Sequence, residues 1–211
     1  MKNPDIEFVL PGSWRFVPVA DEPAAKRAIG RITEQTVGRA DERARLRADI
    51  RARFTAAADR ARGAGGEAMW ICDEITPGVP LPASIVLYRP ALMVRHEESA
   101  EQRRAALHEL LAEPRSDVAE SDLVCGGQPA VRRAETVSGP ATDEPDAPIA
   151  ETIECDYWIV QPDGRGVVLL VFACGMPLLR DKLVELFDLI VATSRWKDGA
   201  SVLPVAETAV V

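Results

Sequence analysis

The stretch from Glu151 to Trp196 constrains the fold more than any other part of this 211-residue chain. From Glu151 to Gln161 apolar and polar residues largely alternate, which is the pattern of a β-strand. The run Pro162-Asp163-Gly164-Arg165-Gly166 favours a tight turn, and Val167–Cys174 after it is apolar at every position. We therefore predict a hairpin whose second strand is central in a sheet and covered on both faces.

A helix is predicted directly after this hairpin. Gly175-Met176-Pro177 ends the strand, and proline is well tolerated in the first turn of a helix. The apolar residues that follow recur at helical spacing, which predicts a helix that packs one stripe against the sheet. That stripe consists of Leu179, Leu183, Leu186, Phe187, Ile190 and Val191.

The N-terminal third predicts two short strands and two helices. The runs Ile6–Leu10 and Trp14–Val19, divided by Pro11-Gly12-Ser13, indicate an opening hairpin or two edge strands. Asp21 is expected to begin a helix that ends at Gly38, and Asp41 to cap a longer helix that ends at the glycines from Gly63. The second helix repeats apolar residues at Leu46, Ile50, Phe54, Ala57 and Ala61.

Two further hairpins are predicted in the middle of the chain. Residues 67–75 and 83–89 are expected to pair across a rigid turn at 76–82, and residues 118–124 with 130–137 across Gly126-Gly127. Ser99 and Gln102 form a capping box for a short helix, and 138–148 is a polar, proline-rich connection. The whole pattern predicts one α+β domain over 1–196, with an antiparallel sheet of six to seven strands and helices on both faces. Its parts would be a helical insertion (22–62), the sheet with the C-terminal helix (67–196), and a partly ordered tail (197–211).

The two middle hairpins, the stretch Gly126-Gly127-Gln128-Pro129-Ala130-Val131-Arg132 and the ending 183–196 resemble the Mog1/PsbP-like fold. The resemblance covers residues 67–196 and implies an α/β/α sandwich. It also implies a non-enzymatic role, because the members are mostly accessory subunits, GTPase-binding factors, lipoproteins and chaperones that load secretion-system effectors. No position in this chain matches a functional residue of that family.

Composition narrows the possible functions. The formal net charge of −8 argues against a general nucleic-acid binder. Cys72, Cys125, Cys155 and Cys174 form no C-x-x-C pair, and with two histidines a zinc site is poorly supported, so we expect buried structural thiols and no metal or cofactor. With no apolar run long enough to span a membrane and no signal-like N-terminus, we expect a cytoplasmic protein.

An arginine stripe in the second predicted helix is the sharpest candidate site. Arg39, Arg43, Arg47 and Arg51 follow one another at steps of four residues. Arginine binds carboxylates and phosphates in a bidentate manner, so the stripe could dock a partner. The alternative is a solvated face whose charges are balanced by nearby Asp and Glu residues.

Trp70 and Trp158 lie in predicted strands and are the other candidate partner-binding residues. Tryptophans at such positions usually pack in the core. If helices cover the sheet incompletely, the same residues would instead line a groove for a segment of another protein.

Catalysis is the competing hypothesis, although no complete catalytic motif is present. A hydrolase-like site could be assembled around His96, Cys72 or the carboxylates of Glu154 and Asp156. The same residues have simpler explanations: His96 as a surface histidine, Cys72 as a core thiol, and Glu154 and Asp156 as carboxylates on the solvent-facing side of a sheet. The glycines 63–66 follow a helix and precede a strand, the reverse of a phosphate-binding loop.

The sequence therefore favours a non-catalytic adaptor, chaperone or accessory subunit that binds another polypeptide. The resemblance also implies a link to a secretion or injection system. A small-molecule enzyme is the alternative. An exposed edge strand or helix face would also permit a homodimer.

Overall fold

The computed structural model describes residues 6–38, 40–92, 99–112, 118–140, 149–164 and 166–197. It is an α+β structure built on an eight-stranded sheet in which every described pairing is antiparallel. Seven strands lie side by side in the order β2 (Ser13–Val17), β3 (Gly66–Thr76), β5 (Ala83–Tyr88), β9 (Val167–Cys174), β8 (Ile149–Val160), β7 (Gln128–Pro140) and β6 (Ala119–Cys125).

The eighth strand corrects the prediction of six to seven. β4 (Val79–Pro80) lies in the segment expected to be only a turn, and it pairs with the end of β3. Gly78 has a φ of +81°, so the chain reverses tightly there and returns along β3. β4 contributes an extra short strand outside the path of the other seven.

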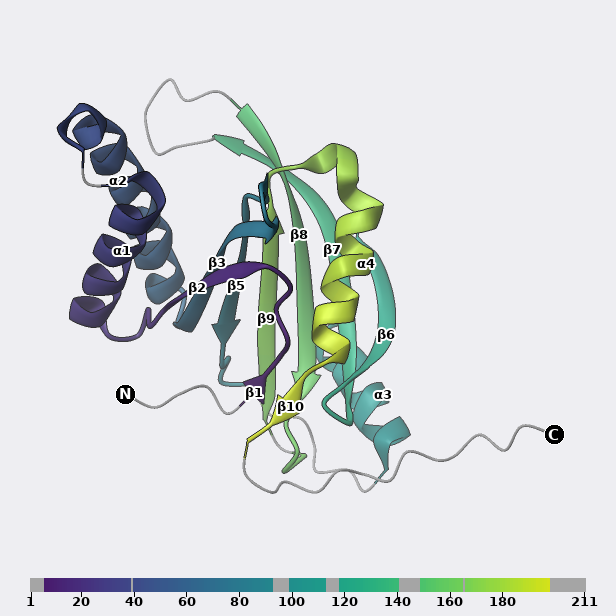
Figure 1. Cartoon of the computed structure of the whole chain (residues 1–211). Coiled ribbons are helices and arrows are strands. Elements are labelled where there is room, and N and C mark those ends of the chain that lie inside the picture. Colours follow the sequence, from purple (N-terminus) through teal and green to yellow (C-terminus); the bar gives the residue numbers. More distant parts are fainter. Residues whose placement is uncertain are drawn as a thin grey trace.

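One face of the sheet, here called the front face, is covered by α4 (Arg180–Ala192). A short 3₁₀ helix, η2 (Pro177–Leu179), directly precedes α4. Figure 1 shows α4 lying lengthwise over this face. Alternate residues of β8 and β9 point toward the helix, and on β8 the inward set Ile153, Cys155, Tyr157 and Ile159 is fully buried, as predicted. Leu183, Phe187, Ile190 and Val191 of the predicted helical stripe are buried against them.

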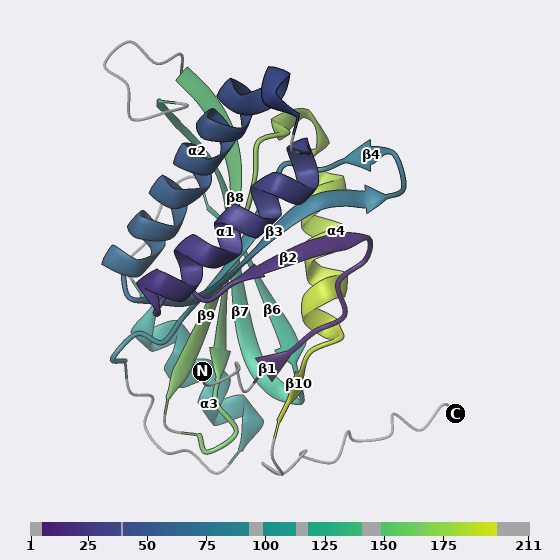
Figure 2. The same ribbon diagram turned by 60° about the vertical axis from the view of Figure 1, so that its left-hand side comes forward.

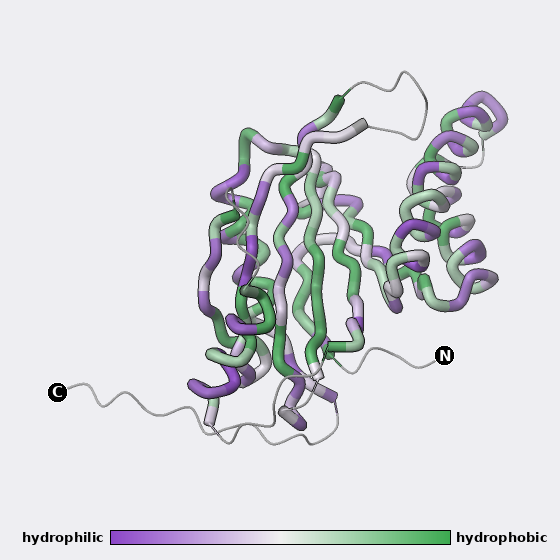
Figure 3. Tube along the Cα trace, turned by 180° about the vertical axis from the view of Figure 1, so that it is seen from behind, coloured by the Kyte–Doolittle hydropathy of each residue, from purple (hydrophilic) through white to green (hydrophobic). Residues whose placement is uncertain are grey.

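The opposite face, here called the back face, carries the other helices. α1 (Glu22–Val37) and α2 (Ala44–Gly63) run as a pair over β2 and β3, and α3 (Ala100–Leu110) lies over β7 and β8 (Figure 2). Between them the centre of the back face is only partly covered. β9 was predicted to be covered on both faces, but Leu169, Val171 and Ala173 are only half-buried, unlike the fully buried residues between them. Figure 3 shows the sheet from behind, with hydrophobic residues, coloured green, along its central strands.

Sequence signals located α1 well and the start of α2 less well. Asp21 accepts a hydrogen bond from the backbone N–H of Ala24, and α1 ends before Gly38, as predicted. Asp41 does not cap α2: residues Asp41–Arg43 form a 3₁₀ turn (η1), and α2 begins at Ala44 without a side-chain cap. The predicted apolar stripe of α2 is only partly buried. Leu46 near the start of the helix is 51% exposed, Ile50, Phe54 and Ala57 are half-buried, and only Ala61 is buried. Ala58, which was not part of the predicted stripe, is also buried.

The chain before β2 forms a strap across the front face, defined here as residues Ile6–Leu10. Its first two residues, β1 (Ile6–Glu7), pair with β10 (Arg195–Trp196) at the other end of the described chain. Of the two predicted alternatives, the opening hairpin is wrong, because β1 pairs with β10 after α4 and not with β2. The alternative of edge strands is confirmed for β2, which lies at the edge of the sheet on β3. Ile6 is 1% exposed, so the strap is anchored in the front-face core.

The two middle hairpins and the capping box of α3 are confirmed. α3 is attached to the sheet by Leu107, which is fully buried, and by Arg103, whose guanidinium donates to the side-chain carbonyl of Gln128 at 3.2 Å. The expected connection at 138–148 begins as the end of β7, and residues 141–148 lie outside the described residues, as do 198–211 of the expected tail. No helix in the described residues is long and apolar enough to cross a membrane.

A polar network joins α4 to the sheet within the front-face core. The hydroxyl of Tyr157 donates to Asp188 at 2.7 Å, and Arg132 forms an ion pair with the other carboxylate oxygen of Asp188. A second nitrogen of Arg132 donates to Ser121 at 2.8 Å. Burial and the bond to Asp188 raise the pKa of Tyr157 well above its usual range.

Candidate functional site

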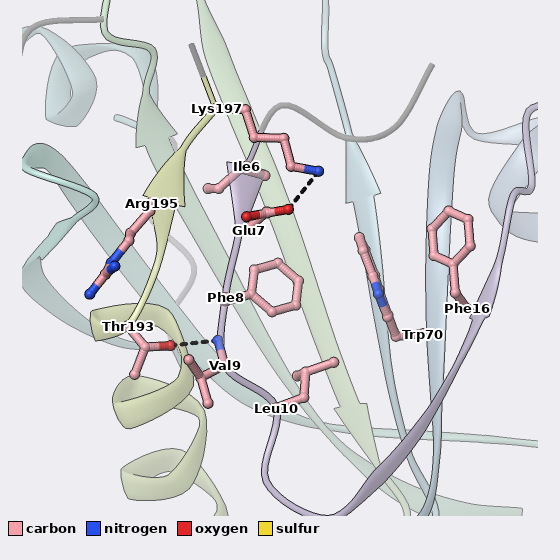
Figure 4. A pocket seen from close by; sticks show the side chains of 10 residues that line it. All are labelled: Ile6, Glu7, Phe8, Val9, Leu10, Phe16, Trp70, Thr193, Arg195 and Lys197. Carbon is pink, nitrogen blue, oxygen red and sulfur yellow. Dashed lines mark hydrogen bonds and ion pairs between the residues drawn. The ribbon is translucent and has the colours of Figure 1, made fainter. Parts of the chain in front are cut away.

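The strap borders a cavity of about 490 Å³ on the front face, here called the strap groove. One wall is the strap itself, and the other is formed by Phe16 on β2 and Trp70 on β3 (Figure 4). The groove exists because Gly12 turns the chain tightly at the end of the strap, with a φ of +80°, so that β2 runs back along β3.

Aromatic rings line the groove. The ring of Trp70 meets that of Phe8 edge-on, with centroids 5.0 Å apart, and that of Phe16 at a tilt, with centroids 5.4 Å apart. All three residues are only partly buried, although their rings pack against the core. Val9, on the rim, is 67% exposed. The groove therefore presents an apolar surface to solvent.

Polar contacts hold the strap in place. The backbone N–H of Val9 donates to the hydroxyl of Thr193 at 2.8 Å, and Lys197 pairs with Glu7 at 2.7 Å (Figure 4). β10 lies along one edge of β1, and the other edge, toward Phe16 and Trp70, has no strand partner among the described residues. An unpaired strand edge beside an aromatic groove is suited to an added strand.

The candidate tryptophans do not share one site. Trp70 belongs to the strap groove, whereas Trp158 lies on the back face, beside Leu169 on β9 and Val131 on β7. The indole N–H of Trp158 is buried and has no hydrogen-bond partner among the described residues. Trp158 therefore packs next to α3 and contributes nothing to the groove around Trp70.

The arginine stripe faces the end of α1. Arg43 donates to the carbonyl oxygen of Val37 at 3.0 Å, and Arg47 to those of Gly38 and Ala40 at 3.0 and 2.5 Å. Val37 is the last residue of α1 and Gly38 follows it, so these two carbonyls lie where a helix has no donors of its own, whereas the Ala40 carbonyl also accepts from the backbone N–H of Arg43 at 3.1 Å. The two arginines therefore have a structural role at the end of α1. Arg51 is exposed, and Arg39 lies outside the described residues. Spacing alone could not distinguish this carbonyl-binding role from docking.

The residues proposed for a hydrolase-like site are dispersed. Cys72 is buried on β3, Glu154 and Asp156 lie on the back face of β8, and His96 is outside the described residues. Both carboxylates already interact with other groups of the protein. Burial, and after it the negative charges of Asp156 and Glu154, raise the pKa of Tyr88. The other histidine, His108, is placed between Glu120 and Asp122, with its ring nitrogens 2.9 and 2.7 Å from their oxygens.

The cysteines are free and buried, as predicted. Burial raises the pKa of Cys72 to about 11 and those of Cys125 and Cys155 to about 12. These thiols stay protonated at neutral pH and are therefore poor nucleophiles. Within the described residues, no cluster of three or more His, Cys, Asp or Glu side chains could hold a metal ion.

The raised thiol pKa of Cys125 predicts a loss of stability in alkali. The folded protein keeps this proton up to about pH 12, whereas the unfolded chain releases it near pH 9.0. Stability is therefore fully present below pH 9.0 and falls above it, by about 1.4 kcal/mol per pH unit for one thiol. The free energy of unfolding can be measured by urea titration of the wild type and of Cys125→Ala at several pH values between pH 8 and about 10.5. Plotted against pH, it should fall less steeply in the variant, by the equivalent of about one proton. Identical slopes would show that Cys125 is not responsible.

Sequence reasoning did not single out Phe8, Leu10 and Phe16 as site residues. Their apolar pattern was visible, but the groove depends on the pairing of β1 with β10, which no local signal predicts. No family model matches this chain, and no curated protein or solved structure is similar enough to count as a match. The function is therefore inferred from the geometry of the surface.

Proposed function

We propose that this protein is a non-catalytic polypeptide-binding protein, an adaptor or chaperone, that holds an extended apolar segment of its partner in the strap groove. The observation that carries the proposal is the free edge of β1 beside the rings of Phe8, Phe16 and Trp70. A peptide strand would bond its backbone to that edge and pack an apolar side chain against the half-buried rings. The resemblance to Mog1/PsbP-like proteins, which include chaperones, supports this role.

The groove suits a peptide better than a small polar metabolite. Six of its ten lining residues are apolar, and Lys197 and Glu7 form an ion pair with each other. Arg195 is the one charged lining residue with no ion pair among the described residues, so a polar metabolite would lose hydration along the apolar wall and gain few matching partners. A peptide needs only backbone hydrogen bonds and one or two apolar anchors, both of which the strap offers. No observation favours the hydrolase-like alternative, because Cys72 is a buried, protonated thiol.

The proposal predicts that random peptides displayed on phage and selected against the protein will be enriched in apolar and aromatic residues. An enriched peptide, made synthetically with a fluorophore, should bind the wild type in an anisotropy titration. Val9→Glu should weaken binding about tenfold or more, because it places a charge at the apolar rim without removing a core side chain. Trp70→Phe should retain binding but lose most of the tryptophan fluorescence change.

The matched control is Ile149→Glu. Ile149 is 72% exposed, comparable with Val9, but lies at the start of β8 and does not line the groove. Equal affinity of wild type and Val9→Glu, or an equal loss in both variants, would contradict the proposed site. Failure to enrich any peptide would contradict the proposed function.

A further inference from the structure

A second and larger groove lies on the back face, between α2 and the sheet. Its volume is about 790 Å³, and it is here called the α2 groove. The floor includes Met69 and Ile71 of β3, which are buried in the core beneath α1 and α2, and the half-buried Ser84 of β5. Ala52 and Ala56 on α2 are short, so the backbone of another chain could approach the helix closely here. The groove lies on the opposite face from the strap groove and is independent of it.

The helices beside this groove are basic in an otherwise acidic chain. Residues 22–63 contain eleven basic and six acidic side chains, although the whole chain has a net charge of −8. Arg45, Arg51 and Arg53 on α2 are exposed and form no hydrogen bond or ion pair within the described residues. They differ from Arg43 and Arg47, which bind carbonyl oxygens near the end of α1, and from Arg62, which pairs with Asp59 and Glu22.

One ridge of α2 combines this charge with an exposed apolar residue. Leu46, Arg53 and Arg60 follow at steps of seven residues and so lie on the same side of the helix. Arg53 and Arg60 line the α2 groove, and Leu46 is 51% exposed. The surface therefore offers an apolar floor, a wall of small residues and a cationic rim.

We propose that the α2 groove binds an acidic amphipathic helix of a protein partner. Its apolar face would cover Ile50 and the floor of the groove, and its carboxylates would pair with Arg53 and with the neighbouring arginines of α2. Nucleic acid fits less well, because only one wall is basic and Asp49 lies within the lining. The aromatic ring in the lining, Phe54, is half-buried and packs against the core beneath α1 and α2, so it is poorly placed to stack on bases. This site goes beyond the proposed function by making the chain a two-sided binder.

The test uses a fluorescent synthetic peptide of about 18 residues, five helical turns, with leucines along one face and glutamates along the other. A scrambled peptide of the same composition and single- and double-stranded DNA of similar length are titrated in parallel. The wild-type protein should bind the amphipathic peptide about tenfold more tightly than the scrambled one, and binding should weaken with added salt. Arg53→Glu should weaken binding about tenfold, and Ala56→Trp, which fills the groove, should also weaken it.

Arg27→Glu on α1 is the matched control, since Arg27 is also exposed and lies outside the groove lining. It should leave the affinity close to that of the wild type, and so should Val9→Glu in the strap groove. Equal binding of the two peptides, equal effects of the Arg27 and Arg53 substitutions, or no binding would overturn the proposal. Tighter binding of DNA that Arg53→Glu abolishes would replace it with a nucleic-acid site.

Discussion

Asp188→Ala is expected to lower the free energy of unfolding by about 3 kcal/mol, the lower end of the range for removing one partner of a buried ion pair, because the Asp188 side chain is itself 28% exposed. The substitution leaves two groups unpaired. Arg132, whose side chain is 12% exposed, loses its carboxylate, and the buried hydroxyl of Tyr157 loses its acceptor. The cost arises mainly because these groups cannot be rehydrated where they lie. Urea or guanidinium unfolding followed by circular dichroism measures it.

Tyr157→Phe is the control for this network. It removes the hydroxyl but leaves Asp188 paired with Arg132, so the expected cost is only about 1 kcal/mol. Asp188→Asn keeps an acceptor and the shape, and should lie between the two. If Asp188→Ala costs no more than Tyr157→Phe, the ion pair with Arg132 does not stabilise the junction between α4 and the sheet.

Gly12→Ala is expected to destabilise the protein by about 2 kcal/mol more than Gly78→Ala. Both glycines have nearly the same positive φ, +80° and +81°, so an alanine at either position carries a strain cost of about 1 kcal/mol. They differ in available space. A Cβ at Gly12 would lie 2.1 Å from the carbonyl oxygen of Glu74, whereas nothing lies within 4 Å of one at Gly78.

The clash at Gly12 is with backbone, so it can be relieved only by moving the strap away from β3. Gly12→Ala should therefore also weaken peptide binding in the strap groove, and amide spectra should show shifts concentrated at Ile6–Leu10 and β10. Unfolding titrations and NMR spectra of the two variants provide the comparison. Equal stabilities would mean that the strap adapts without cost, and the groove would not depend on this turn.

The parts of the fold that local signals determine were predicted closely. β9 begins and ends at the predicted residues, and α1 is bounded by Asp21 and Gly38 as expected, because alternation, capping and glycine act within a few residues. β4 was missed because a two-residue strand has too little pattern to distinguish it from a turn. The start of α2 was misplaced because Asp41 leads into a 3₁₀ turn.

The candidate sites were harder to predict, since they depend on contacts between distant segments. Trp70 was singled out from its strand position and does line a groove, but the other residues of that groove come from the strap and β2. Trp158 had the same sequence signal and lies on the other face next to α3. The stripe around Arg47 was predicted as a docking surface from helical spacing, which does not reveal that the preceding helix ends within reach of Arg47.

The pairing of β1 with β10 also fixes an order of assembly. Ile6 and Trp196 pair across almost the whole described chain, so their contact can form only after the sheet and α4 have brought the two ends together. Two strand pairs, the buried side chain of Ile6 and the contacts of Val9 with Thr193 and of Glu7 with Lys197 attach the strap. These are far fewer contacts than hold any long strand of the sheet, so the strap is expected to open without unfolding the rest. The groove would then be completed last in folding and released first, which allows a bound segment to leave while the sheet stays intact.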